Sequence, residues 1–235
     1  LVIGGLFVYF LKGAQHKLQF LSLVAFQNSG YLPLALVGAL LPAEQLSTAF
    51  IYIFLFLMGF NLVMFSLGVH MLTFHKNKKF ELASLFSPPV AAIIFSLVLI
   101  FFGAAKFVPE VVLKPLQLVG NCTLPLAMFL VGGSLAEIRL RHVDKKAVFL
   151  MILAKMFILP LLGLWLVFSL KLPQLIGLLV LIQLMMPPAT TLSVIIRHYK
   201  KEDLIISQGI FFGHLISIIT IPVFLSLYFA LGMVK

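Results

Sequence analysis

The stretch Asn28-Ser29-Gly30-Tyr31-Leu32-Pro33 decides the fold, because it places polar and helix-breaking residues in the middle of an apolar run over residues 18–41. About 20 apolar residues cross a bilayer as a helix, so this run is long enough to span one. Glycine is conformationally permissive and proline lacks an N–H donor, which predicts an interrupted helix. Met186-Pro187-Pro188-Ala189-Thr190-Thr191 interrupts the run 172–196 in the same way. An ordinary proline kink is the alternative for either stretch alone.

Apolar runs make up most of the remaining sequence. Hydrophobic residues form 62% of the 235 residues and charged residues only 10%, which excludes a soluble globular domain. In lipid every backbone group must be satisfied internally, so long runs without strict alternation predict an all-α membrane protein. The chain begins inside a short apolar run, from which we expect a fragment of a longer protein. We expect about eight spans, the first of them partial, over residues 1–11, 18–41, 46–72, 85–105, 111–135, 147–170, 172–196 and 204–234.

Basic residues alternate between the connecting segments, so the net charge of +10 indicates membrane topology rather than a nucleic-acid partner. Lys106, Lys114, Lys171 and Lys235 belong to one side. The positive-inside rule predicts that the richer side is cytoplasmic and that the C-terminus lies outside. That richer side carries Lys12, Lys17, Lys76, Lys78, Lys79, Arg139, Arg141, Lys145, Lys146, Arg197, Lys200 and Lys201.

An internal repeat relates the two ends of the chain. The segment from Gly4 to Lys12 matches the segment from Gly163 to Lys171 at equal spacing. Gln27 before the first interruption has a counterpart in Gln183 before the second. The matched units lie an odd number of spans apart, which predicts opposite orientations and hence an inverted repeat. Inverted repeats are typical of secondary transporters whose site lies at mid-membrane, where two broken helices meet.

Two crossed broken helices would also supply the binding chemistry. Their free N–H groups and positive dipole ends favour a carboxylate, so we expect a small organic anion near Asn28 and Thr190. Asn121 and Thr123 could line this site or hydrogen-bond between helices instead. The predicted substrate-binding residues are Asn28, Ser29, Gly30, Pro33, Asn121, Thr123, Gln183, Pro187, Pro188, Thr190 and Thr191.

Lys155 and His214 are ionisable residues that lie well inside predicted spans. Lys155 is either a counter-charge for the anion or a side chain that snorkels to the cytoplasmic interface. His214 could relay protons or simply form hydrogen bonds. The spans carry no deep Asp or Glu, which weakens a cation-exchanger hypothesis. Metal, phosphate-loop and nucleophile signatures are also lacking, so we expect no enzyme, cofactor or metal. The coupling ion, H⁺ or Na⁺, stays open.

Three motifs in order resemble the auxin efflux carrier family, which includes plant PIN-FORMED carriers and bacterial permeases for small dicarboxylates. They are Asn28-Ser29-Gly30-Tyr31-Leu32-Pro33-Leu34, then Asn121-Cys122-Thr123-Leu124-Pro125-Leu126 followed by Gly132-Gly133-Ser134-Leu135, then Pro187-Pro188-Ala189-Thr190-Thr191. The resemblance implies ten helices in two inverted five-helix repeats, with crossed broken helices four and nine and both termini outside. This chain would begin within helix three.

The resemblance also implies how the chain is divided. Residues 1–72 and 147–235 would be the transport-domain helices of the two repeats, and 85–135 the scaffold helices, joined by cytoplasmic loops 73–84 and 136–146. It implies a homodimer formed through the scaffold, in a bacterial cytoplasmic membrane. A sodium/bile-acid-symporter-like carrier and a non-transporting membrane sensor or assembly protein are the alternative functions.

Overall fold

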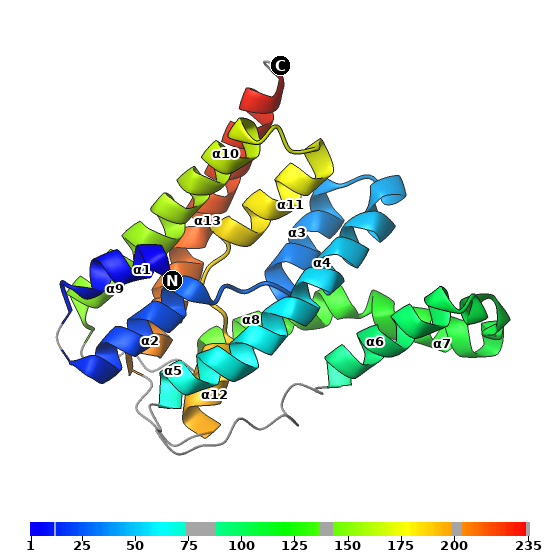
Figure 1. Ribbon diagram of the computed structural model, residues 1–235, viewed down its shortest axis with the longest axis horizontal. Helices are drawn as coiled ribbons and strands as arrows, with labels where there is room; N and C mark the ends of the chain where they lie inside the picture. The colour runs from blue at the N-terminus through cyan, green and yellow to red at the C-terminus, as the bar shows by residue number, and fades with distance from the viewer. Residues whose placement is uncertain (12, 74–87, 137–142, 199–203, 234–235) are drawn as a thin grey trace.

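The computed structural model describes residues 1–11, 13–73, 88–136, 143–198 and 204–233, and its regular elements there are helices (Figure 1). The first part comprises α1 (Val2–Val8), α2 (Ala14–Ala25), α3 (Tyr31–Leu40), α4 (Ala43–Val63), the π-helix η1 (Met64–Gly68) and α5 (Val69–Thr73). The middle comprises α6 (Pro88–Phe101), the 3-10 helix η3 (Ala104–Phe107), α7 (Glu110–Asn121) and α8 (Thr123–Ala136). The last part comprises α9 (Lys145–Ile152), the π-helix η4 (Leu153–Ile158), α10 (Leu159–Ser169), α11 (Gln174–Met185), α12 (Thr191–His198) and α13 (Leu204–Met233).

Three helical stretches are long and apolar enough to cross a bilayer. They are Ala43–Leu72, Lys145–Ser169 and Leu204–Gly232, with mean hydropathies of 2.2, 2.4 and 2.2. Tyr31–Leu40 and Gln174–Met185 are apolar but shorter. The prediction of an all-helical, membrane-spanning protein is therefore confirmed, whereas the count of eight spans stays a prediction. Most of the loops predicted at 73–84 and 136–146 lie outside the described residues.

The predicted run 111–135 is divided at Cys122, between α7 and α8. Pro125 has no N–H to donate to the carbonyl oxygen of Asn121, so the ladder of an α-helix cannot continue through this turn. The N–H of Cys122 instead bonds the carbonyl oxygen of Val119, three residues back, at 3.1 Å. The sequence analysis did not predict this break.

Two helix pairs cross at the centre of the molecule. Residues 26–30 separate α2 from α3, and residues 186–190 separate α11 from α12. The two connections pass each other near the middle of the ribbon (Figure 1). Both α2 and α12 contact α5 at one end, and both α3 and α11 contact α4 at the other. The paths therefore run in opposite directions, in agreement with the antiparallel bridge between Gln27 and Pro188.

Two apolar clusters flank this crossing. One contains Phe20, Leu192 and Ile206, and the other contains Val37 and Ile182, among others. Each cluster combines residues from the first and last parts of the chain, so these parts form one packed body. The helices α6 and α7 project to one side of it (Figure 1), and α7 has no buried residue.

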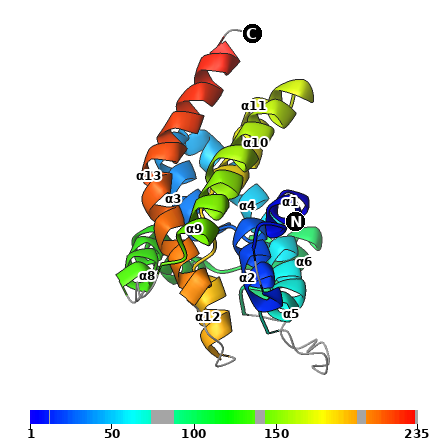
Figure 2. The ribbon, with the colours of Figure 1, turned by 90° about the vertical axis from the view of Figure 1, so that its left-hand side faces the viewer.

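Helix α13 runs along the whole body and approaches the crossing at two glycines (Figure 2). A Cβ atom at Gly213 would lie 2.6 Å from Cδ of Pro188. A Cβ atom at Gly209 would collide with the side chain of Leu23. Small residues allow membrane helices to pack closely, and here they set α13 directly against both paths.

We predict that Gly213→Ala destabilises the protein by about 1–3 kcal/mol, because the rigid ring of Pro188 cannot yield to the added methyl group. The measurement is thermal unfolding of the detergent-solubilised protein. Gly59→Ala is the matched control, since a Cβ atom there would meet nothing within 4 Å. Equal unfolding temperatures for the two variants would contradict the close packing of α13 on the crossing.

Candidate functional site

The two non-helical segments satisfy each other's backbone groups at the crossing. The N–H of Asn28 donates to the carbonyl oxygen of Pro187 at 2.8 Å, and the N–H of Ala189 donates to the carbonyl oxygen of Phe26 at 3.0 Å. Asn28, Phe26 and Ala189 are each less than 5% exposed. Because unpaired backbone groups are costly in lipid, this pair of hydrogen bonds allows both helices to be interrupted.

Most of the predicted binding residues lie at the crossing. Gly30 and Thr191 are half-buried there, at the starts of α3 and α12. The others in these segments are buried: Asn28, Ser29, Pro33, Gln183, Pro187, Pro188 and Thr190. Asn121 and Thr123 are instead exposed, at the junction of α7 and α8. The structure does not bring these last two to the crossing, and substrate binding by any of the set stays a prediction.

Asn28 also contacts His214 of α13. Its Nδ2 lies 3.5 Å from Nε2 of His214, while Nδ1 of the same ring lies 2.8 Å from the carbonyl oxygen of Ile210. A carbonyl oxygen only accepts, so Nδ1 carries the hydrogen and Nε2 of the neutral ring accepts from Asn28. His214 is thus hydrogen-bonded at both nitrogens and fixes the side chain of Asn28. A proton relay through it stays a prediction.

Lys155 caps the interrupted end of α2. In a continuous helix the carbonyl oxygen of Val24 would accept the N–H of Asn28, but that N–H donates to Pro187 instead. The Nζ atom of Lys155 takes its place, 2.9 Å from the oxygen of Val24 and 3.5 Å from Oε1 of Gln27. The side chain is 1% exposed, so the snorkelling alternative is wrong. A cation at a helix C-terminus is also favoured by the helix dipole.

Gln183 joins the second path to the first and keeps one atom unpaired. Its Nε2 donates to the carbonyl oxygen of Ser29 at 3.2 Å. Because that carbonyl only accepts, the orientation of the amide is fixed. Its Oε1 is buried and has no hydrogen-bond partner among the described residues. A buried acceptor without a partner costs about 1–3 kcal/mol, which marks this atom as a candidate ligand contact.

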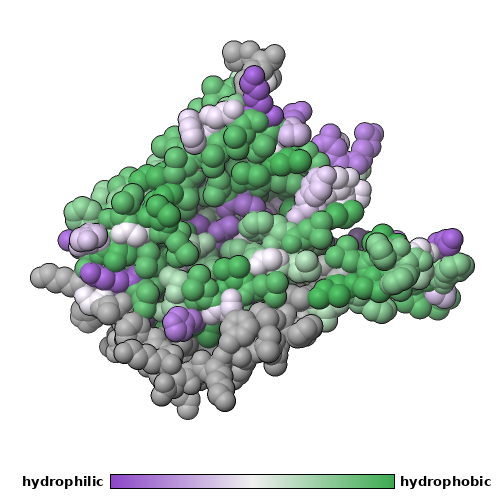
Figure 3. Space-filling model, in the orientation of Figure 1, coloured by the Kyte–Doolittle hydropathy of each residue, from purple (hydrophilic) through white to green (hydrophobic). Residues whose placement is uncertain are grey.

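A cavity of about 390 Å³, here called the central recess, lies beside the crossing between α4 and α11. Gln27 and Gln183 are the side-chain amides that line it. Its other lining residues are apolar or aromatic: Tyr52, Ile53, Phe56, Ile176, Leu179, Val180 and Leu184. Figure 3 shows hydrophilic residues inside a hollow at the middle of this face, with hydrophobic residues around them. An apolar cavity with a few converging polar groups is typical of small-molecule sites.

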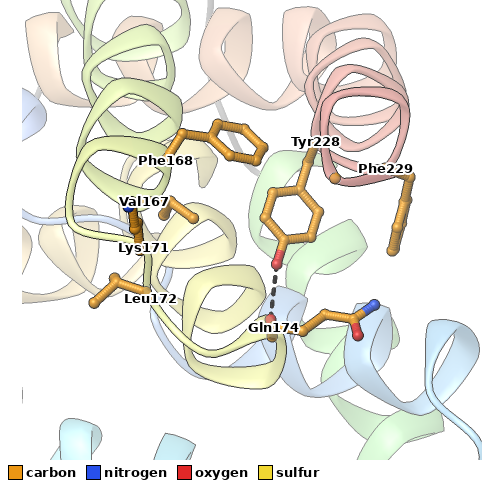
Figure 4. A pocket seen from close by; sticks show the side chains of 8 residues that line it. Val167, Phe168, Lys171, Leu172, Gln174, Tyr228 and Phe229 are labelled. Atoms are coloured by element: carbon orange, nitrogen blue, oxygen red, sulfur yellow. Dashed lines mark hydrogen bonds between the residues drawn. The ribbon is translucent and has the colours of Figure 1, made fainter. Parts of the chain in front are cut away.

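A second cavity of about 540 Å³ lies at the turn between α10 and α11 (Figure 4). Phe168, Lys171, Tyr228 and Phe229 are among its lining residues. The hydroxyl of Tyr228 donates to the carbonyl oxygen of Gln174 at 2.7 Å and so ties α13 to this turn. The unpaired buried side-chain atoms of the described residues are Gln183 Oε1 and Thr220 Oγ1, and neither residue lines this cavity. The central recess, which Gln183 lines, is therefore the cavity of the two with an unpaired buried polar atom that a ligand could satisfy.

Family membership is shown by comparison with known families. Residues 1–225 match a family model described as membrane transport protein. The chain belongs to the auxin efflux carrier family. No characterised protein and no solved structure matches it. As an auxin efflux carrier family member it is an integral membrane transporter rather than an enzyme, and the resemblance carried by its motifs is confirmed. Among the described residues, no three His, Cys, Asp or Glu side chains gather as metal ligands.

The structure adds contacts that the sequence analysis missed. The pairs Lys155 with Gln27 and Asn28 with His214 join residues more than 100 positions apart. The aromatic residues Tyr52 and Phe56 line the recess from α4, where they resemble any other apolar position of that helix. The sequence did indicate Gln27 and Gln183, because these two glutamines occupy matched positions of the internal repeat.

We predict energetic coupling between Lys155 and Gln27. Their hydrogen bond should make the effects of Lys155→Met and Gln27→Leu on unfolding free energy non-additive by about 0.5–3 kcal/mol. A double-mutant cycle in detergent, with denaturant unfolding as readout, measures this coupling. The control cycle pairs Lys155→Met with Gln174→Leu, at an exposed position near the start of α11, and should be additive. Additivity in both cycles would contradict the hydrogen bond between Lys155 and Gln27.

Proposed function

We propose that this protein is a secondary transporter of a small organic anion, a carboxylate or dicarboxylate, that works by alternating access at the crossing. The observation that carries the proposal is the pair of backbone hydrogen bonds between residues 26–28 and 187–189. They place two helix interruptions, in oppositely directed paths, at one buried point of a member of a transporter family. Such a point is where secondary transporters hold their substrates.

The groups around the crossing suit an anion. Tyr31 and Leu32 belong to the first turn of α3, where backbone N–H groups have no intrahelical acceptor. Thr190 and Thr191 add hydroxyl groups at the start of α12. The buried amino group of Lys155 lies at the same crossing, where a bound anion would favour its charged form, and this supports its proposed role as counter-charge. In this proposal Asn28 and Gln183 orient the substrate.

The proposal includes an inverted repeat and a topology. The opposite directions of α2–α3 and α11–α12 support the repeat. The start of α2, the start of α9 and the end of α12 lie on one side of the body, away from the α10–α11 turn and the C-terminus (Figures 1 and 2). These helix ends carry Lys17, Lys145 and Arg197. This distribution supports a cytoplasmic side at those ends and an outer C-terminus. The proposal also includes a homodimer that forms through residues 85–135. It places the protein in a bacterial cytoplasmic membrane.

We predict that Asn28→Ala lowers carboxylate uptake at least about tenfold, as expected when a hydrogen bond to a charged substrate is lost. Uptake of radiolabelled malonate, succinate and indole-3-acetate into proteoliposomes measures the effect. Asn121→Ala is the comparison, because Asn121 is exposed at the α7–α8 junction. Unchanged uptake by Asn28→Ala would remove Asn28 from the site. An equal loss in Asn121→Ala would add that junction to it.

The same assay separates the alternative functions. Uptake that requires Na⁺ would favour a carrier like the sodium/bile-acid symporters, whereas uptake driven by a pH gradient would favour H⁺ as the coupling ion. Thermal stabilisation by a carboxylate, without flux into vesicles, would favour a membrane sensor or assembly protein.

A further inference from the structure

We propose that the cavity of about 540 Å³ at the α10–α11 turn, here called the turn cavity, binds the head group of an anionic phospholipid whose phosphate pairs with Lys171. The inference goes beyond the proposed function, because it concerns a site at the ends of the helices rather than at the crossing. It does not depend on which substrate the protein carries.

The turn cavity lies at the depth where lipid head groups are found. Two of the stretches that are long and apolar enough to cross a bilayer, Lys145–Ser169 and Leu204–Gly232, end beside it. Gly232 itself lines the cavity, and Lys171, two positions after Ser169, lines it too. A helix that crosses a bilayer ends at the level of the head groups. Phospholipid head groups are therefore the nearest ligands to this cavity.

Lys171 adopts a backbone conformation that its side chain disfavours. Among the described residues it is the non-glycine residue with a positive φ, 51°. It follows α10 as in a Schellman motif, because the N–H of Leu172 bonds the carbonyl oxygen of Val167 at 3.1 Å and its own N–H bonds that of Phe168 at 3.4 Å. Glycine usually occupies this position, since a Cβ atom there costs free energy. A cation in the last turn of α10 would serve the helix dipole without this cost, so we attribute the lysine to the cavity that it lines.

The polar groups of the turn cavity suit a phosphate. Lys171 carries the charge among the described residues that line it, so the cavity is positive. Its ammonium group donates to phosphate oxygens, and the side-chain amide of Gln174, which also lines the cavity, has two further N–H groups. Both residues are exposed, so a head group reaches them without a rearrangement of the helices.

The apolar walls suit a lipid rather than a free anion. Phe168 and Phe229 stand on either side of Tyr228 (Figure 4), with ring centroids 5.9 and 5.4 Å from that of Tyr228. Leu170 and Leu231, each next in sequence to a lining residue, are 64% and 47% exposed. A free phosphate gains nothing from such surface, whereas the glycerol and acyl carbons of a phospholipid are removed from water against it.

The turn cavity is held in shape before a ligand binds. The hydroxyl of Tyr228 donates to the carbonyl oxygen of Gln174 at 2.7 Å (Figure 4). Gly177 allows this approach, since a Cβ atom there would lie 3.2 Å from that hydroxyl and 2.8 Å from Cγ1 of Val167. Binding therefore need not order these walls, which lowers its free-energy cost.

The test is native mass spectrometry of the detergent-purified protein, titrated with lipids that share the same acyl chains. Dioleoyl phosphatidylglycerol, which is anionic, should bind at least about tenfold more tightly than zwitterionic dioleoyl phosphatidylcholine, as expected for a hydrogen bond to a charged group. Soluble glycerol 3-phosphate carries the phosphate without the acyl chains and should not compete with the lipid.

Three variants locate the effect. Lys171→Gln should lower the affinity for phosphatidylglycerol at least about tenfold. Lys106→Gln is the matched control, because Lys106 is also exposed near the end of an apolar helix but lies outside the cavity, and it should stay within about twofold. Lys171→Gly should bind as weakly as Lys171→Gln yet unfold at no lower temperature, because glycine adopts the positive φ freely.

Several outcomes would overturn the proposal. Equal affinity for the two lipids, or equal losses in Lys171→Gln and Lys106→Gln, would indicate unselective contact with lipid. Competition by glycerol 3-phosphate would indicate a site for a soluble phosphate instead. Earlier unfolding of Lys171→Gly than of Lys171→Gln would contradict the argument from the backbone.

The inference and the transport proposal fail separately. Asn28→Ala should keep its affinity for phosphatidylglycerol, because Asn28 lies at the crossing and does not line the turn cavity. Absence of carboxylate uptake would overturn the transport proposal and leave the lipid site standing. Absence of selective lipid binding would overturn the lipid site and leave transport standing.

Discussion

The structure depends on the two backbone hydrogen bonds that join residues 26–28 to residues 187–189. A helix that stops inside a membrane exposes polar backbone groups that lipid cannot solvate. Here the segment after α2 and the segment after α11 each supply hydrogen-bond partners for the other's backbone groups. This mutual dependence explains why the first and last parts of the chain form one packed body, with apolar clusters that draw on both.

Side chains complete what the backbone leaves unpaired around this crossing. Lys155 replaces the N–H that Asn28 no longer offers to Val24, and His214 holds the amide of Asn28. Gln183 reaches across to Ser29 but keeps its own oxygen without a partner. Most of the polar atoms described at this centre therefore have a hydrogen-bond partner. Oε1 of Gln183 does not, which makes it a candidate ligand contact.

The sequence identifies the elements of this centre but not its pairings. Gly30, Pro33, Pro187 and Pro188 act locally on their own helices, so their positions predict where the helices stop. Which donor meets which carbonyl depends on how distant helices pack, and apolar composition leaves that open. Lys155 illustrates the limit, because its depth from the interface suggested snorkelling, whereas packing turns it inward to Val24. The break at Cys122 was missed because Pro125 lies one turn beyond it and the run 111–135 is long enough to read as a single span.

The π-helix η4 that carries Lys155 spans Leu153–Ile158, inside an otherwise α-helical stretch. A π-turn accommodates one residue more than an α-turn, so this stretch behaves like an α-helix with a single-residue insertion. Deleting one residue here would restore a regular helix and rotate one flank relative to the other by about 100°. The flanking helices α9 and α10 would then present different faces to their neighbours. The π-turn that carries Lys155 thus sets which faces the two halves of the helical stretch Lys145–Ser169 turn to their neighbours.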